Sequence, residues 1–112
     1  MTLVESMASF VNNRRVEDIV KTYADLVMRE IKVSSIYLYG SYAKGTYSED
    51  SDIDIAVIGD DFIGDPIEDT LLLMRIRRKV DNRIEPHPFK SSDFDLTIPY
   101  VQEILRTGIK IM

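Results

Sequence analysis

Two aspartates one residue apart open an apolar stretch near the middle of the chain. Asp52 and Asp54 flank Ile53, and the run from Ile53 to Ile58 has the β-branched, apolar character of a strand. Side chains two residues apart in a strand project to the same face, so the two carboxylates should stand together while Ile53 and Ile55 point to a core. Adjacent carboxylates repel each other unless a cation lies between them. The pair therefore indicates a divalent metal site, and hard oxygen ligands favour Mg²⁺ or Mn²⁺.

A glycine and a serine lie upstream of these acids, directly after another β-type run. Gly40 and Ser41 follow the predicted strand Ser35 to Tyr39, and Lys44 lies in the same turn. Glycine lets the backbone approach a ligand closely, and a serine hydroxyl with neighbouring amides can hold phosphate oxygens. Residues 41 to 44 should open a short helix whose N-terminus faces the phosphates. The sequence thus predicts a metal ion and a phosphate at one site.

A purely structural interpretation of the same residues is available. Gly-Ser pairs and Asp-rich turns occur on many solvated surfaces, and Ser48 to Asp52 could be a capping loop without chemistry. Acids within an otherwise hydrophobic strand conflict with local structure, as functional groups often do. We therefore favour the functional interpretation.

The combined pattern resembles a known family. Gly40-Ser41, ten intervening residues and Asp52-Ile53-Asp54 resemble the G-S-x(10)-D-x-D signature of the nucleotidyltransferases related to DNA polymerase β. The compact form is most similar to the minimal nucleotidyltransferases, or MNT proteins, and the similarity is dense from about Ser35 to Asp60. As a joint pattern it is specific, although either part alone would mean little. The resemblance implies the polymerase β-like fold, an α/β (α+β) arrangement in which helices flank a small mixed β-sheet.

The resemblance also implies a set of site residues. In that family a third acidic residue on a neighbouring strand completes the metal site. Glu85 is the matching position, with glutamate where many relatives have aspartate, and Asp81 is the less favoured substitute. The implied site has a triad of catalytic and metal-binding acids and three nucleotide-binding residues: Asp52, Asp54 and Glu85, with Gly40, Ser41 and Lys44.

The known activity of MNT proteins indicates which function to expect of this chain. They are often paired with a helical HEPN ribonuclease toxin and act as its antitoxin by transferring AMP to a tyrosine of the toxin. The resemblance therefore implies a cytoplasmic protein adenylyltransferase that uses ATP and Mg²⁺, with two ions as the expected number, and has a HEPN-type toxin as its partner. Two alternatives stay open: a nucleotidyltransferase for aminoglycoside-like small molecules, and a non-catalytic antitoxin that acts by occlusion.

Size bears on how the acceptor is presented. A chain of 112 residues should be a single minimal nucleotidyltransferase domain over residues 1–112. Larger members of the superfamily carry a second helical domain for the acceptor, for which we expect no room here. The acceptor should then come from another subunit or protein, in a homodimer or a hetero-oligomer.

Composition narrows the partners. The net charge of −5 argues against broad electrostatic binding to nucleic acid. Cysteine is absent, which excludes disulfides and thiolate metal sites and fits a reducing cytosol. No apolar run approaches the ~20 residues of a membrane span. The first 11 residues also lack the pattern of a signal peptide.

Periodicity predicts the helices that must carry these strands. Apolar residues from Val16 to Ile31 recur with a helical period, with Asn13 as a plausible cap, and residues 3–11 have similar spacing. A second helix should begin at Pro66 with Asp65 as its cap. We expect it to have a broad apolar face made of Ile67, Leu71, Leu72, Leu73, Met74, Ile76 and Val80. Its basic cluster is interpreted as a solvated helix end rather than a polyanion contact: Arg75, Arg77, Arg78 and Lys79.

The last third of the chain is predicted more loosely. The prolines within Arg83 to Phe89 suggest a short strand of limited pairing. A final helix should begin near Ile98 and stop at Gly108, leaving an apolar tail that could pair with a strand edge or with a partner. His87 should share a face with Glu85, where we favour a packing or surface role. Tyr42 and Tyr47 could stack on a base, but packing is favoured for them too.

Overall fold

A mixed β-sheet forms the centre of the computed structural model, which describes residues 14–112. The elements in chain order are α2 (Arg14–Glu30), β1 (Ser35–Tyr39), α3 (Ser41–Lys44), β2 (Ile53–Ile58), α4 (Pro66–Arg77), β3 (Ile84–Phe89), the 3₁₀ turn η1 (Ser91–Asp93), α5 (Pro99–Thr107) and β4 (Ile109–Lys110). The strand order is β3-β2-β1-β4. β1 runs antiparallel to β2 and to β4, whereas β2 and β3 are parallel. This confirms the predicted small mixed sheet flanked by helices.

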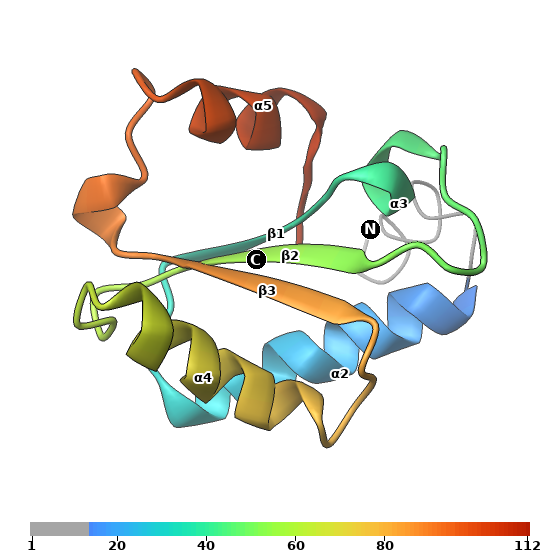
Figure 1. Cartoon of the computed structure of the whole chain (residues 1–112), viewed down its shortest axis with the longest axis horizontal. Coiled ribbons are helices and arrows are strands. Elements are labelled where there is room, and N and C mark those ends of the chain that lie inside the picture. The colour runs from blue at the N-terminus through green and yellow to red at the C-terminus, as the bar shows by residue number, and fades with distance from the viewer. Residues whose placement is uncertain (1–13) are drawn as a thin grey trace.

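The helices cover the two faces of the sheet differently. α2 and α4 lie against one face, whereas α5 lies over the other, with α3 at the end of β1 (Figure 1). Strand alternation sends Ile53, Ile55 and Val57 into the main core with α2 and α4. Tyr39, Ala56 and Ile58 share the opposite face with Ile104 of α5. Asp54 has the same parity as the second set, so its carboxylate belongs to the face under α5.

The predicted amphipathic helix is confirmed as α2. Its buried residues recur with the helical period and include Val16, Val20 and Val27. The buried Tyr23 hydroxyl donates a hydrogen bond of 2.8 Å to the carbonyl of Leu73, which ties α2 to α4. Asn13 and residues 3–11 lie outside the described residues. Within residues 14–112 no helix has both the length and the apolar character needed to cross a bilayer.

The start of α4 is as predicted, but its apolar face is not. The Asp65 carboxylate accepts hydrogen bonds from the amides of Ile67 and Glu68, so it caps the helix as expected. The prediction of one broad apolar face was wrong, because Leu73 and Ile76 are buried whereas Ile67 is 71% exposed and Leu71 is 51% exposed. The apolar residues of this helix are spread around its axis, and the sheet can cover only the side that carries Leu73 and Ile76.

The strand β3 pairs more fully than the prolines suggested. All six of its residues are in register with β2, so the expectation of limited pairing was wrong. The carbonyls of Arg83 and Phe89 accept hydrogen bonds of 2.8 and 3.0 Å from the amides of Ile53 and Gly59. The backbone N–H and C=O groups of the odd-numbered residues of β3 therefore point toward β2. By alternation the backbone nitrogens of Pro86 and Pro88 point to the outer edge of the sheet, where a missing N–H group removes no hydrogen bond to β2. The prolines also make that edge a poor template for another strand.

The end of the chain returns to the sheet. The amide of Gly108 donates to the carbonyl of Ile104 and closes α5. β4 then pairs antiparallel with β1, aligning Leu38 with Ile109, and Ile111 is buried. The predicted pairing of the apolar tail with a strand edge is therefore confirmed.

Candidate functional site

The turn from β1 into α3 passes directly beside an acidic side chain. Gly40 has a φ of +74°, a region in which side chains are strained. A Cβ atom at this position would also collide with the Asp54 carboxylate. Glycine is therefore required here for two independent reasons. Its lack of a side chain lets the backbone of the turn lie against the Asp54 carboxylate.

The sheet register brings two of the predicted acids together. Asp54 and Glu85 are partners on the parallel strands β2 and β3, so their side chains emerge from adjacent positions on the face under α5. Asp54 is half-buried, whereas Glu85 is exposed. Asp52 lies just before β2 and is exposed. The structure thus joins Asp54 with Glu85 and leaves Asp52 at the mouth of the strand.

The donor chemistry at this pair suits a divalent ion. Mg²⁺ commonly takes one or two carboxylates from the protein and completes its shell with water and substrate phosphate oxygens. Asp54 and Glu85 supply such a pair of oxygen ligands at neighbouring positions. No group of three His, Asp or Glu side chains poised to hold a metal occurs in the part of the chain that the structure describes. The metal-binding and catalytic roles of the acidic triad therefore stay predictions.

A histidine stands beside the same carboxylate. His87 Nε2 is 3.6 Å from Asp54 Oδ1, and it has no hydrogen-bond partner among residues 14–112. The His87 ring also meets the edge of the Tyr39 ring, with centroids 5.5 Å apart. His87 therefore packs against an aromatic ring, as favoured from the sequence, and in addition lies next to Asp54. Alternation along β3 predicted that His87 shares a face with Glu85. No local sequence pattern predicted that it would lie beside Asp54 of β2.

The buried tyrosine at the end of β1 completes this face. The Tyr39 hydroxyl shares a short hydrogen bond with the hydroxyl of Tyr100 on α5. Burial raises the pKa of Tyr39 well above that of an ordinary tyrosine, and the Tyr100 hydroxyl and the negative charges of Asp54 and Glu85 raise it further. Tyr39 therefore keeps its proton and remains a hydrogen-bond donor. Sequence reasoning missed this contact, since the two tyrosines are 61 residues apart.

Lys44 is engaged by the helix above it. Its Nζ lies 3.3 Å from Oε1 of Glu103 on α5. Hydrogen bonds from Arg106 and then Lys44 lower the pKa of Glu103. An exposed pair of this kind is weak because water screens it, so a polyphosphate can compete for the lysine. Ser41, which begins α3, is half-buried.

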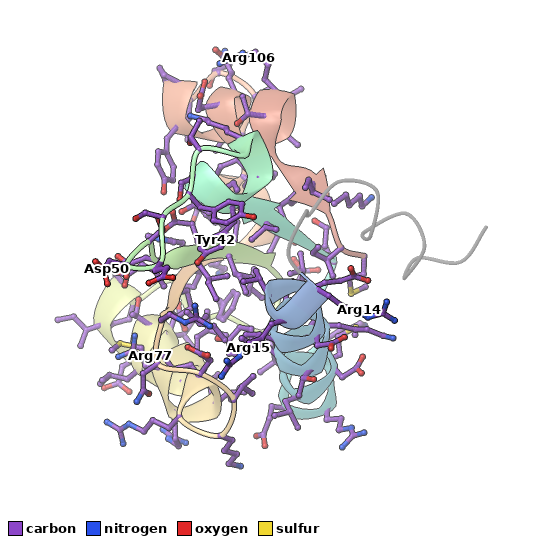
Figure 2. All side chains as sticks on the ribbon, turned by 90° about the vertical axis from the view of Figure 1, so that its right-hand side faces the viewer. Arg14, Arg15, Tyr42, Asp50, Arg77 and Arg106 are labelled. Carbon is purple, nitrogen blue, oxygen red and sulfur yellow. The ribbon has the colours of Figure 1, made fainter. Side chains whose placement is uncertain are left out.

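A pocket of about 460 Å³ lies beneath the loop that joins α3 to β2, lined by Arg15, Tyr42, Tyr47, Ser48, Glu49 and Arg83. Figure 2 shows Tyr42 under α3, Asp50 on the outer side of this loop and Arg15 at the start of α2. The Tyr42 and Tyr47 rings stack on each other with centroids 4.5 Å apart. This agrees with the packing role favoured for both.

Protonation of Asp81 should weaken the turn before β3. The Asp81 carboxylate accepts hydrogen bonds from the Arg83 amide and guanidinium, and chiefly the side-chain hydrogen bond lowers its pKa below the ordinary 3.8. Since the folded state has the lower pKa, the stabilisation is complete above about pH 4 and is lost as the pH falls through the folded value. We expect Asp81→Asn to lower the free energy of unfolding at pH 7 by about 1 kcal/mol, and by less at pH 3.

Urea titrations at the two pH values measure this difference. Asp50→Asn makes the same change of charge at an exposed loop position and should leave the stability unchanged. A destabilisation by Asp81→Asn that is equal at both pH values would contradict an electrostatic origin.

Comparison with known proteins identifies relatives by sequence. The family model described as Polymerase beta, Nucleotidyltransferase matches residues 17–112. Two candidate protein adenylyltransferases of Methanocaldococcus jannaschii match shorter stretches: MJ0604 is 55% identical over 29 residues, and MJ1379 is 43% identical over 42 residues. These stretches cover 26% and 38% of this chain. They span only 29% and 42% of the length of these curated relatives.

Solved structures share the fold. A candidate nucleotidyltransferase of Sulfolobus solfataricus has a TM-score of 0.63 at 14% identity, covering 96% of this chain and 84% of that one. A chain of a toxin–antitoxin complex with AMP-PNP has a TM-score of 0.57 at 24% identity, covering 82% and 72%. A chain from a mutant of the MntA–HpeT toxin–antitoxin complex has a TM-score of 0.53 at 23% identity, covering 80% and 68%. At these identities the likeness establishes the fold, which is the predicted polymerase β-like one.

Proposed function

Because the chain belongs to the polymerase beta nucleotidyltransferase family, whose model it matches over residues 17–112, we propose that it transfers AMP from ATP to a hydroxyl of a partner protein. The observation that carries this proposal is the pairing of Asp54 with Glu85 on one face, directly beside the glycine turn at residue 40. The names of the two M. jannaschii relatives support protein adenylylation. The toxin–antitoxin complex with AMP-PNP supports the choice of an adenine nucleotide.

In this proposal the nucleotide lies along the turn from β1 into α3. The Gly40 backbone and the Ser41 hydroxyl contact the phosphates, because a glycine lets the backbone approach a ligand closely and a hydroxyl can donate a hydrogen bond to a phosphate oxygen. Lys44 exchanges Glu103 for the phosphate tail. Asp54 and Glu85, with Asp52 at the mouth, would hold Mg²⁺, which supplies positive charge to the triphosphate when it is bound.

The chemistry required of the protein is mainly positioning. The acceptor hydroxyl oxygen forms a bond to the α-phosphorus, the bond from that phosphorus to pyrophosphate breaks, and pyrophosphate leaves with the electron pair. Holding the two reactants in line and neutralising the developing charge lower the barrier of such a transfer. In this proposal Asp54 and Glu85 organise the reacting groups on the face under α5.

We further propose that the acceptor is a tyrosine of a HEPN-type toxin and that the chain acts as its antitoxin. The neighbouring structures that are toxin–antitoxin complexes support this choice of partner. The decisive experiment incubates the purified chain with ATP labelled at the α-phosphate, Mg²⁺ and the product of the adjacent gene. Label on a tyrosine of that product, together with loss of its toxicity, is the expected result.

The same experiment, with a panel of aminoglycosides as alternative acceptors, separates the two rivals. Label on an aminoglycoside and none on the protein partner would reject the antitoxin hypothesis. Neutralisation that persists when Asp52→Ala and Asp54→Ala are combined would show that occlusion, not transfer, controls the partner.

Lys44 offers a test of nucleotide binding. If it contacts the phosphate tail in the ground state and the transition state alike, Lys44→Ala should raise the KM for ATP about tenfold while kcat stays nearly constant. Glu103→Gln should lower KM about twofold to fivefold, because it releases Lys44 from its ion pair. Lys21→Ala removes an exposed lysine of α2 and should change neither parameter. Unchanged KM in Lys44→Ala would remove this residue from the nucleotide site.

A further inference from the structure

A tyrosine of the chain itself stands over the candidate site. Tyr100 is in the first turn of α5, and it is 47% exposed. Its hydroxyl shares the short hydrogen bond with Tyr39, and the two rings meet edge to face with centroids 5.9 Å apart. The Tyr100 ring also lies 6.4 Å from His87 and 6.3 Å from Phe89. These contacts fix the position of the ring.

The hydrogen bond places the Tyr100 oxygen close to the paired acids. Tyr39 is the register partner of Asp54 on the neighbouring strand, and Asp54 is in turn the partner of Glu85. The negative charges of both carboxylates also raise the pKa of Tyr39. The Tyr100 hydroxyl is therefore hydrogen-bonded to Tyr39, a residue that lies directly beside the proposed site.

The other tyrosines are less suited to receive a group. Tyr23, Tyr39 and Tyr42 are buried, and Tyr37 and Tyr47 are half-buried in ring stacks. Of the chain's six tyrosines, Tyr100 alone has an exposed side chain. A residue that is about half exposed can accept a new group without leaving the core, whereas a buried tyrosine would have to leave it.

The helix that carries Tyr100 is anchored over the site. α5 lies over one face of the sheet in both views (Figures 1 and 2), and alternation along β2 places Asp54 on that face. Val101 and Ile104 are fully buried beneath it, and Glu103 reaches Lys44 of α3. A hydroxyl held in this way meets a bound nucleotide at a high effective concentration.

We propose that Tyr100 is a self-modification site, to which the chain transfers AMP from ATP within the same molecule. This inference rests on the proposed adenylyltransferase function. The Tyr100 oxygen forms a bond to the α-phosphorus, and the bond between that phosphorus and the pyrophosphate oxygen breaks. Pyrophosphate departs with the electron pair, and the phenolic proton passes to solvent. The Tyr39 hydroxyl donates a hydrogen bond to the Tyr100 oxygen as the latter gives up its proton.

The test uses the purified full chain with ATP labelled at the α-phosphate and Mg²⁺, without any partner. We expect one AMP per chain, located by fragmentation to Tyr100 in the tryptic peptide of residues 91–106. The first-order rate constant should stay constant when the protein is diluted about tenfold, since the transfer is intramolecular. A rate that falls with dilution, or label at any other residue, would overturn the proposal.

Two conservative variants sharpen the result. Tyr100→Phe keeps the ring but removes the acceptor oxygen, and self-labelling should fall to background. Tyr37→Phe removes the hydroxyl of a half-buried tyrosine on the same face and should label like the parent chain. Circular dichroism spectra should show that both variants are folded.

A parallel reaction with the partner separates this inference from the function on which it rests. Label on the partner but not on the chain would refute self-modification and leave the adenylyltransferase function standing. Absence of label on both would refute the two together.

Discussion

Replacing Asp54 with asparagine should lower kcat for AMP transfer by at least about a thousandfold. Asparagine has nearly the same shape, so the packing between the Gly40 turn and β3 can persist. It lacks the negative charge that a metal ion would require, and it leaves only Glu85 and, at the mouth of the strand, Asp52 as acids of the site. The measurement is the initial rate of label transfer to the partner protein at saturating ATP and Mg²⁺, together with a urea titration for stability.

A matched control keeps the change of charge but moves it away from the site. Asp50 is exposed and lies on the outer side of the loop that leads to β2 (Figure 2). Asp50→Asn should retain a rate within about twofold of the parent chain, as expected of a surface substitution away from functional groups. If Asp54→Asn retains more than a tenth of the parent rate while folded, Asp54 is not a principal catalytic group.

Adding one methyl group at position 40 should have the second large effect. In Gly40→Ala the new Cβ meets the Asp54 carboxylate, and the φ of +74° becomes strained. We expect the free energy of unfolding to fall by about 1–3 kcal/mol. Transfer should slow by about a hundredfold or more, since a displacement near 1 Å in a catalytic group can cost that much. Stability comes from urea titration and the rate from the labelling assay.

Gly45 supplies the control that separates strain from collision. It lies at the other end of α3 with a φ of +78°, but no atom of residues 14–112 lies within 4 Å of where its Cβ would be. Gly45→Ala should therefore lose about 1–2 kcal/mol of stability and keep most of its activity. Equal losses of activity in the two variants would mean that contact with Asp54 is not what the glycine at position 40 provides.

Local patterns were enough to predict most elements of the fold. The 3.6-residue period specified α2, alternation specified the faces of β1 and β2, and the Asp65-Pro66 pair specified the start of α4. Such signals depend on neighbours a few residues apart, because backbone geometry fixes which side chains share a face. The Gly-Ser and Asp-x-Asp pattern pointed to the site for the same reason, since each part lies within one turn or one strand.

The apolar face of α4 and the pairing of β3 went beyond these local rules. Whether Ile67 is covered depends on where the sheet ends, and whether a proline disrupts a strand depends on which edge it faces. The sequence carries neither fact in a short window. Both were decided when β3 became the outer strand beside β2.

By itself the sequence determined which residues share a face of α2, β1 and β2, and so which side chains of these elements are available for chemistry. Only the tertiary structure decided which of them meet: Glu85 beside Asp54, Lys44 with Glu103, and Tyr100 over Tyr39. The physical reason is that strand register and helix docking are set by burial of the whole core. Contacts between segments up to 61 residues apart then follow from that packing and from no local propensity.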